Sequence, residues 1–398
     1  MLGPAVLRSR RFKAVNDHHG HAIGDAVLGI VSRRLAEVVR PGDVVGRLGG
    51  DEFVIIAPGV TSPDRAIEIA ERARRSFALP MDVDGLTLTL GSSIGIATTS
   101  SGDTSVSTML SEADLAVYEA KAKGRGEIVL CTDELLMTAA RLDQLEHELR
   151  SALGAGELAL HYQPIIQVRT GAVLAFEALI RWERPGEPPV DPSVFLPVAA
   201  RSELIVAIDA SVLDQVAAQL VRWDEDDVHR GVRVGVNLSP RSLMSPDLEQ
   251  MVLEPMRAHA VDPARLGIEV SENSIIRGSG DVIEKLDRLR ASGIRIIVED
   301  FGTAYSMLAR LEDLPIDVLK IDRATVENPG ATPLMQMVMA TGQHLGVKVV
   351  AEGVETSEQA DRVAAIGIEA AQGFLYASPA PPDRLLATHP SSASPTSD

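Results

Sequence analysis

The feature that most constrains the fold is a series of short apolar runs in the C-terminal half of the chain. They alternate with amphipathic segments of helix length, the pattern expected of repeated strand–helix units. The eight runs are Glu157–Ile165, Ala172–Trp182, Val232–Ser239, Arg265–Glu272, Ile294–Gly302, Ile316–Asp322, Val347–Glu355 and Ile368–Tyr376. This number predicts a closed (β/α)8 barrel, in which functional residues lie at the C-terminal ends of the strands. The alternative is a doubly wound open sheet, but no glycine-rich dinucleotide-binding motif supports it.

Length and charge narrow the possible classes of protein. With 398 residues the chain is too long for one ordinary core, so two domains are expected. A formal net charge of −18 opposes nonspecific binding to nucleic acid, which depends on lysine and arginine neutralising phosphates. Cys131 is the only cysteine, and no apolar run approaches the ~20 residues of a membrane span. We therefore expect a cytoplasmic protein with no membrane span and no nucleic acid partner.

The two halves are joined by a segment in which apolar residues recur at helical spacing. This segment runs from Asp133 to Gly154. The sequence predicts a small α+β domain of the palm or ferredoxin-like kind at 1–130, a connecting helix at 131–155, a barrel domain at 142–391 and a disordered tail at 392–398. The tail consists of serine, proline, alanine and other residues that leave little to bury. The whole chain is thus predicted to be an α/β protein.

Polar side chains, most of them acidic, stand at the ends of the predicted barrel strands. In chain order they are Glu177, Asn237, Glu269, Glu299 with Asp300, Lys320 with Asp322, Glu352 with Glu355, and Gln372. Because the strands of such a barrel end at one mouth, we expect these side chains to converge. Carboxylates gathered at a buried rim require a cation. Any single one of them is equally well explained as a solvated loop charge, but the set on successive strands favours a site.

The types of donor in this set indicate hard divalent cations. All the candidate ligands are oxygen donors and none is histidine or cysteine, which favours Mg²⁺ or Mn²⁺ over Zn²⁺. The oxygens suffice for two metal ions, and such a pair can clamp the attacking water and the leaving oxygen of a phosphodiester. Lys320 adds a cationic donor near the phosphate. The sequence therefore predicts a two-metal site for a phosphodiester.

The same residues lie in motifs that resemble those of EAL domains. The motifs are Tyr162-Gln163-Pro164, Glu177-Ala178-Leu179 with Arg181-Trp182, Asn237-Leu238-Ser239, Glu269-Val270-Ser271-Glu272, Asp300-Phe301-Gly302-Thr303, Lys320-Ile321-Asp322, Ala351-Glu352-Gly353-Val354-Glu355 and Gln372-Gly373. They extend over the whole C-terminal half, so the joint match is far more specific than the three letters EAL. The resemblance implies binding of the bacterial second messenger cyclic di-GMP and its hydrolysis to linear pGpG.

The resemblance also implies a role for each motif residue. The implied metal ligands are Glu177, Asn237, Glu269, Glu299, Asp300, Asp322 and Glu352, with the residue at 299 bridging two ions. Lys320 and Glu352 would orient or activate the attacking water, with support from Gln372. Gln163 and Arg181 would contact the substrate. Glu272 would brace the loop from Phe301 to Ser306, which in this family couples dimer contacts to the metal site, and a homodimer is expected.

Two positions depart from the family pattern. The family has Asp at 299 and Gly at 304, whereas this chain has Glu299 and Ala304. Glu299 keeps the charge but moves the carboxylate by about an ångström, a misplacement that can cost on the order of a hundredfold in rate. Ala304 restricts a backbone position where glycine allows positive φ. We expect weakened hydrolysis, with binding better preserved.

A second set of motifs, in the N-terminal half, resembles GGDEF diguanylate cyclase domains. The signature is Arg47-Leu48-Gly49-Gly50-Asp51-Glu52-Phe53, whose glycines permit a tight turn close to a nucleotide. The resemblance implies three kinds of contact with GTP or cyclic di-GMP. They are base contacts from Asn16 and Asp25, phosphate contacts from Lys121 and Arg125, and an RxxD inhibitory site for product formed by Arg40 and Asp43.

The beginning of this half departs from the cyclase pattern. The family has an apolar strand ending in Asp-x-Asp before Phe12, whereas Arg8, Ser9 and Arg10 stand there in this chain. A cation in the place of a metal ligand repels the metal. The preceding helix and its Leu-Thr-Gly-Leu box are absent, so we expect a domain that lacks its start and a central strand. It is either truncated or a degenerate regulator.

These observations leave two main hypotheses of function. The first is a metal-dependent cyclic di-GMP phosphodiesterase, weakened by Glu299, with a GGDEF half that binds nucleotide without catalysis. The second is a receptor that binds cyclic di-GMP without cutting it and signals through the connecting helix. A working cyclase is the third and least supported.

Overall fold

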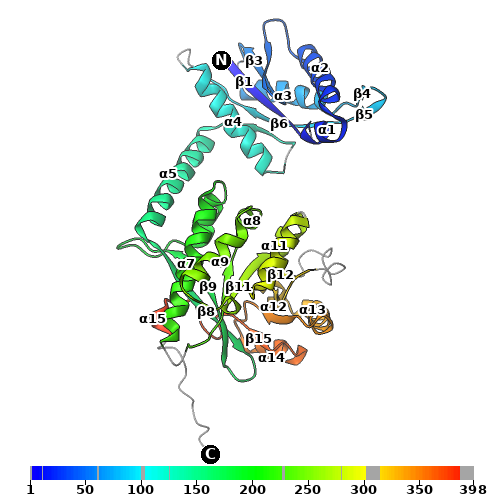
Figure 1. Ribbon diagram of the computed structural model, residues 1–398. Coiled ribbons are helices and arrows are strands. Elements are labelled where there is room, and N and C mark those ends of the chain that lie inside the picture. The colour runs from blue at the N-terminus through cyan, green and yellow to red at the C-terminus, as the bar shows by residue number, and fades with distance from the viewer. Residues whose placement is uncertain are drawn as a thin grey trace, which may run out of the picture. The chain divides into compact units, whose positions relative to one another are not determined.

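The computed structural model describes residues 2–10, 12–60, 62–99, 104–124, 126–225, 229–278, 280–301 and 314–385. The chain divides into two compact units, Met1–Gln144 and Leu145–Asp398. Their boundary falls inside helix α5 (Asp133–Ala155), the long helix predicted between the two halves. The predicted tail at 392–398 lies outside the described residues. Figure 1 labels the elements of both units.

The N-terminal unit is built on a five-stranded sheet with the strand order β2–β3–β1–β6–β7. The strands are β1 (Leu2–Arg10), β2 (Val44–Gly49), β3 (Glu52–Pro58), β6 (Gly91–Ile96) and β7 (Ile128–Leu130). The pair β6–β7 is parallel and the other neighbours are antiparallel. A separate hairpin is formed by β4 (Met81–Val83) and β5 (Leu86–Leu88).

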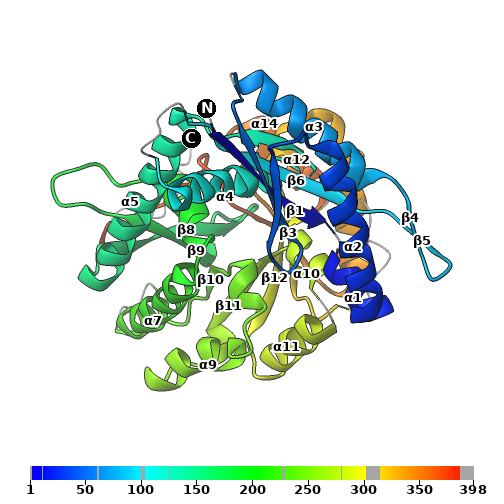
Figure 2. The ribbon, with the colours of Figure 1, turned by 90° about the horizontal axis from the view of Figure 1, so that it is seen from above.

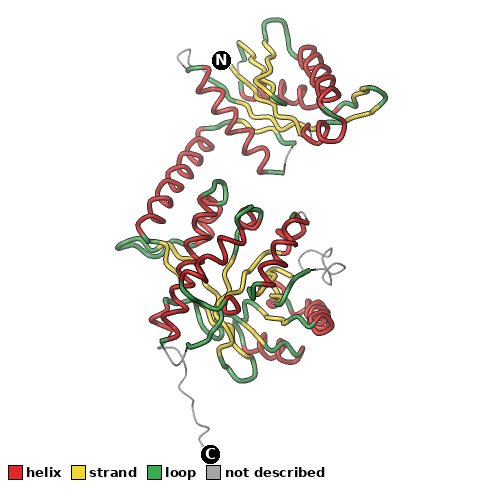
Figure 3. The backbone as a smooth tube through the Cα atoms, viewed as in Figure 1, coloured by secondary structure: helices red, strands yellow, loops and turns green. Residues whose placement is uncertain are grey.

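Helices cover both faces of this sheet, as Figure 3 shows. They are α1 (Phe12–His19), α2 (His21–Val38), α3 (Pro63–Ala78) and α4 (Val106–Ala122). Because successive strand side chains point to opposite faces, Leu7 joins the core formed with α2 and α3, whereas Val6 joins the smaller core formed with α4. The predicted small α+β domain is confirmed.

The expectation that this domain lacks a central strand is wrong. β1 lies in the middle of the sheet and pairs with β3 on one side and β6 on the other, from Ala5 to Arg8 on both sides. The apolar stretch Ala5–Leu7 is short and adjoins two arginines, so its alternation is weak in the sequence. Its position between two neighbouring strands is a tertiary effect, which a local pattern does not reveal.

The C-terminal unit is a closed barrel with the strand order β10–β11–β12–β13–β14–β15–β8–β9, which confirms the predicted barrel. The strands are β8 (Leu158–Gln167), β9 (Val173–Trp182), β10 (Val234–Asn237), β11 (Leu266–Ser271), β12 (Arg295–Phe301), β13 (Val318–Ile321), β14 (Lys348–Ala351) and β15 (Ala370–Ala371). In Figure 2 the helices α7, α9 and α11 lie outside these strands.

One strand differs from the predicted series of βα units, because β8 is antiparallel to both of its neighbours. β8 and β9 are joined by residues 168–172, and a parallel crossover needs a dozen or more residues. The hairpin reverses β8, so its residue Gln163 pairs in register with Glu177 of β9. A side chain from β8 is thereby placed at the mouth where the parallel strands end.

The remaining elements of the barrel unit are helices and short 3-10 turns. They are α6 (Pro192–Ala199), α7 (Leu204–Asp224), α8 (Pro240–Leu243), α9 (Leu248–Ala258), η1 (Pro263–Arg265), α10 (Glu272–Arg277), α11 (Gly280–Ala291), α12 (Arg323–Glu327), η3 (Pro329–Ala331), α13 (Thr332–Leu345), α14 (Ser357–Ile366) and α15 (Pro382–Leu385). By length and composition, α7 is the one candidate membrane span among the described residues. Leu213, Val216 and Leu220 of α7 are fully buried in the barrel core, as in a core helix.

Candidate metal centre

The polar residues predicted at the strand ends meet at one mouth of the barrel. Glu177 lies in β9, Glu269 in β11, Glu299 in β12 and Lys320 in β13, while Glu352 directly follows β14. The parallel register brings neighbours level with one another, since Asn237 of β10 pairs with Glu269 and Ser271 of β11 pairs with Glu299. Convergence was the central structural expectation, and these contacts show it.

Lys320 is the centre of this cluster. Its Nζ lies 2.9 Å from Oε2 of Glu177, 2.5 Å from Oε2 of Glu269, 2.7 Å from Oε1 of Glu352 and 3.4 Å from Oε1 of Glu299. The lysine side chain is fully buried, as is that of Glu269. An ammonium group can donate three hydrogen bonds, so Lys320 is saturated by carboxylates. Four carboxylates thus surround one cation.

The two most buried carboxylates respond oppositely to this environment. Burial opposes ionisation of Glu177, but Lys320, Gln372 and Asn237 hold the pKa of its carboxyl below the usual value. For Glu269, burial and then the adjacent Glu177 raise the pKa well above the usual value, although Lys320 opposes them. Burial also raises the pKa of Glu352 to about 7, against the attraction of Lys320. The cluster therefore contains more carboxylate groups than positive charges.

The cluster fits a divalent cation. Ligand oxygens of Glu177, Glu269 and Glu299 lie within 4.8 Å of one another, close enough to share an ion. Oε1 of Glu269 is buried and has no hydrogen-bond partner among the described residues. A buried carboxylate oxygen without a donor is costly unless a cation satisfies it. The donors are all oxygens, which suits Mg²⁺ or Mn²⁺.

Two glutamines and an asparagine connect the cluster to its surroundings. Nε2 of Gln372 donates to Oε2 of Glu177 and to Oε1 of Gln163, both at 2.8 Å. Nε2 of Gln163 donates to the carbonyl of Ala377 at 3.0 Å, and Nδ2 of Asn237 donates to Oε1 of Glu177 at 2.8 Å. These donors fix the orientation of Glu177, the carboxylate with the most hydrogen bonds in the cluster.

A cavity of about 230 Å³ opens above the cluster. Its walls include the predicted Gln163, Glu177, Glu299, Glu352 and Gln372. Arg181, the other predicted substrate contact, is half-buried in β9 and donates to the carbonyl of Ile180 at 2.8 Å.

One residue in the cavity wall, Arg323, was not predicted from the sequence. Its Nη2 lies 2.8 Å from Oε1 of Glu355. The signal was available, because Arg323 directly follows the Lys320-Ile321-Asp322 motif. A guanidinium beside an acidic site is suited to a phosphate group.

Four residues singled out in the sequence lie apart from the carboxylate cluster or outside the described residues. Asp322 caps helix α12, where its carboxylate accepts hydrogen bonds from the backbone N–H groups of Ala324 and Thr325. Glu272 is fully buried in the first turn of α10. The side chain of Asp300 and all of Ala304, with the loop at 302–313, lie outside the described residues.

Among the described residues, the predicted nucleotide contacts of the N-terminal unit lie on α1, α2 and α4 and in the segment between α2 and β2. Gly50 has φ +51°, a left-handed conformation that favours glycine, in the turn between Gly49 and Glu52. Oδ1 of Asn16 is buried without a partner among the described residues, close to Gly24, whose position has no room for a Cβ atom. Asp25 is exposed on α2 and Lys121 lies in the last turn of α4.

Arg40 and Asp43, the predicted inhibitory pair, bind each other. Nε of Arg40 lies 3.2 Å from Oδ1 of Asp43, and its Nη2 donates to the carbonyl of Pro58 at 2.5 Å. The pair is therefore internally satisfied. Arg125 lies outside the described residues.

Comparison with known proteins finds a matching domain family for each unit. Residues 146–379 match the model of the EAL domain, and residues 5–127 match that of the diguanylate cyclase GGDEF domain. Bifunctional diguanylate cyclase/cyclic di-GMP phosphodiesterase MucR of Pseudomonas aeruginosa is 35% identical over 381 residues, which are 95% of this chain and 55% of MucR. Cyclic di-GMP phosphodiesterase NbdA of the same species is 35% identical over 96% of this chain and 49% of NbdA.

Solved structures resemble the barrel unit. The structure described as PaMucR phosphodiesterase in a c-di-GMP complex is 36% identical, with a TM-score of 0.58. The match covers 61% of this chain and 99% of that one. The chain spans about half the length of the curated relatives named above.

Proposed function

The chain belongs to the EAL domain family and carries a GGDEF domain in its N-terminal unit, and from this premise we propose that it hydrolyses cyclic di-GMP to pGpG with divalent metal ions. The observation that supports this most is the convergence of four carboxylates on Lys320 at one barrel mouth. Relatives named as cyclic di-GMP phosphodiesterases agree with it.

We propose two Mg²⁺ or Mn²⁺ ions, held by Glu177, Asn237, Glu269, Glu299, Asp300 and Glu352. When bound, such ions neutralise phosphate charge and lower the pKa of water. We exclude Asp322 from the proposed ligands, because its oxygens accept hydrogen bonds from the backbone of α12. We assign it the role of placing α12 and hence Arg323.

The side chains around the cavity have separate tasks in this proposal. Glu352 lies in the cavity wall, where it could accept a proton from the attacking water; in the metal-free chain burial raises its pKa to about 7. Lys320 holds Glu177, Glu269 and Glu352 in place and keeps a positive charge beside the phosphate. Gln163 and Arg181 are proposed substrate contacts, Gln372 orients Glu177, and Glu272 supports the adjoining loop.

Glu299 is the reason to expect a slow enzyme. Its Oε1 lies 3.4 Å from Lys320 Nζ, and its negative charge contributes to the raised pKa of Glu269. A carboxylate drawn toward its neighbours is displaced from the position that the shorter Asp would give it. A shift of about an ångström can cost on the order of a hundredfold in rate.

The same observation supports a second candidate function, a receptor that binds cyclic di-GMP without cutting it. Incubation of the purified chain with cyclic di-GMP and Mn²⁺ or Mg²⁺, followed by chromatography, separates the two. If the chain is an enzyme, pGpG should form with the wild type and with Glu254→Gln, an exposed control, but not with Glu177→Gln. Saturable binding of cyclic di-GMP with no pGpG from the wild type would favour the receptor.

For the N-terminal unit we propose nucleotide binding without catalysis. Asn16 and Asp25 would contact the base, Lys121 and Arg125 the phosphates, and Arg40 with Asp43 the product. Arg8 and Arg10 occupy the end of β1, where the cyclase pattern has metal-binding aspartate. GTP should bind and yield no cyclic di-GMP, and formation of that product would refute this assignment. A homodimer is proposed for the full chain, to be measured by light scattering.

A further inference from the structure

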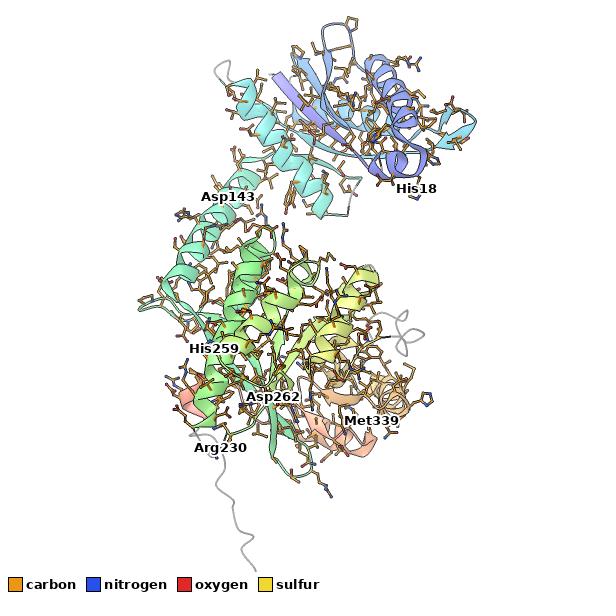
Figure 4. The ribbon with its side chains drawn as sticks, in the orientation of Figure 1. His18, Asp143, Arg230, His259, Asp262 and Met339 are labelled. Carbon is orange, nitrogen blue, oxygen red and sulfur yellow. The ribbon has the colours of Figure 1, made fainter. Side chains whose placement is uncertain are left out.

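The barrel has a second cavity at the mouth opposite the carboxylate cluster. It measures about 560 Å³, within the usual range for small-molecule sites. Its lining comes from the N-terminal ends of the parallel strands, the C-terminal end of β8, and α13 with the turn that follows it. Figure 4 labels Met339, which is on α13 in the wall of this cavity.

Several of the strands that line this cavity contribute small residues to it. Closed barrels of this type normally pack their interior with bulky branched side chains. Here Ala175, Gly235, Gly267 and Ala370 line the cavity from four of the strands and carry at most a methyl group. Ile165, Ile297 and Val318 complete an apolar wall. The cavity at this end of the barrel thus has a largely apolar wall.

The rim of the cavity carries cations without anionic partners. Arg233, Arg295 and Lys348 line it, and among the described residues none of the three makes an ion pair. The pKa of the Arg233 guanidinium is lowered by burial and then by the adjacent Arg295. Glu369 also lines the cavity, but no ion pair joins it to these cations in the described structure. Two neighbouring guanidinium groups without a counterion are suited to one acidic group.

We call this second cavity the lower cavity and the mouth with the carboxylate cluster the upper mouth. We propose that the lower cavity is a binding site for a small amphiphilic anion. Its carboxylate or phosphate group is held by Arg233 and Arg295 at the rim, and its apolar body lies against the apolar wall. The site lies at the mouth opposite the carboxylate cluster, and the proposal does not depend on whether the chain hydrolyses cyclic di-GMP.

Lys320 connects the two ends of the barrel. It lines the lower cavity and its Nζ contacts the four carboxylates of the upper cluster. A ligand in the lower cavity would therefore pack against the residue that holds the metal-binding side chains. Any effect of such a ligand on metal affinity must be matched by an equal effect of metal on ligand affinity.

The test is calorimetric titration of the full chain with octanoate, an amphiphilic monoanion. We expect saturable binding that weakens at least tenfold in Arg233→Gln and in Arg295→Gln, about 1.4 kcal/mol each. The control Arg257→Gln, an exposed arginine on α9, should bind like the wild type. Lys348→Gln, at the same rim, provides the same test if either arginine variant fails to fold.

Two further titrations separate this site from simpler ones. Neutral 1-octanol has the same tail and should bind at least tenfold more weakly than octanoate, and inorganic phosphate alone should bind more weakly still. Equal binding of 1-octanol would overturn the role of the arginines, and equal binding of phosphate would overturn the apolar part. Absence of saturable octanoate binding to the wild type would overturn the proposal.

Discussion

Replacing Lys320 by methionine tests the electrostatic description of the cluster most directly. Lys320→Met keeps a long apolar side chain but removes the only cation that contacts Glu177, Glu269, Glu299 and Glu352 in the described structure. Removing one partner of a buried ion pair costs about 3–5 kcal/mol, because the remaining charge is buried without compensation. We expect the metal-free barrel to lose this amount at pH 8. A domain of this size then melts lower by roughly 2–4 °C for each kcal/mol.

The chain contains its own probe for this measurement. Both of its tryptophans, Trp182 and Trp223, are buried in the barrel unit, so their fluorescence reports unfolding of that unit. Urea unfolding in EDTA gives the metal-free stability. Lys285→Met is the matched control, because Lys285 is also buried but pairs with one exposed carboxylate, that of Asp281. The control should cost less than about 1 kcal/mol of electrostatic stabilisation.

Metal and pH should both relieve the defect of Lys320→Met. Mn²⁺ supplies the missing positive charge and should stabilise this variant more than the wild type, since the ammonium group no longer competes for the carboxylates. Lowering the pH to 5.5 protonates Glu352, whose pKa is raised to about 7 by burial, and should shrink the defect. A loss in EDTA no larger than that of Lys285→Met, or an equal response of wild type and variant to Mn²⁺, would refute the reasoning.

Three further predictions concern the metal site. Glu299→Asp should raise the rate of pGpG formation at least roughly tenfold if the extra methylene is the defect, and an unchanged rate would reject that explanation. Gly235→Ala should weaken Mn²⁺ binding by roughly 10–100-fold, because its Cβ would lie 1.9 Å from Oε1 of Glu269. Gly267→Ala, which meets the flexible end of Ile297, should have a smaller effect, and equal Mn²⁺ affinities would count against this account. Because the pKa of Glu352 is raised to about 7, it binds a proton on folding, and metal-free stability should fall from about pH 4.5 to pH 7. Titrations with Mn²⁺ in two buffers should show proton release and an affinity that rises through pH 7, whereas a pH-independent affinity would contradict it.

The sequence predicted the barrel and the contents of its upper mouth because both depend on strand periodicity. The direction of a strand decides at which mouth of the barrel a polar residue at its end lies. For this reason the sequence predicted the positions of Glu177, Glu269 and Glu352. The reversal of β8 also had a sequence signal, the short connection at 168–172, but the repeated pattern obscured it. β1 was missed because its strand character depends on two neighbouring strands.

The internal contacts of the site could not be predicted from strand positions. Asp322 stands at the end of its strand like the other acids, yet the helix that begins at Arg323 uses its carboxylate as a cap. Whether an acid at such a position points to a metal or to the next helix depends on the first turn after the strand. The lower cavity was missed as well, since small residues at inward positions have no polar signature.

The opposite pKa shifts of Glu177 and Glu269 indicate where the barrel most needs a metal ion. Glu177 receives hydrogen bonds from Lys320, Gln372 and Asn237, so its charge is stabilised by the protein alone. Glu269 is equally enclosed, but one of its oxygens has no donor among the described residues. Without a metal, the raised pKa of Glu269 favours its protonated form, and an external cation favours the ionised form. Glu177 is therefore the preorganised ligand, whereas Glu269 exchanges its proton for the metal, so that metal affinity and metal-free stability are set by the same buried carboxylate.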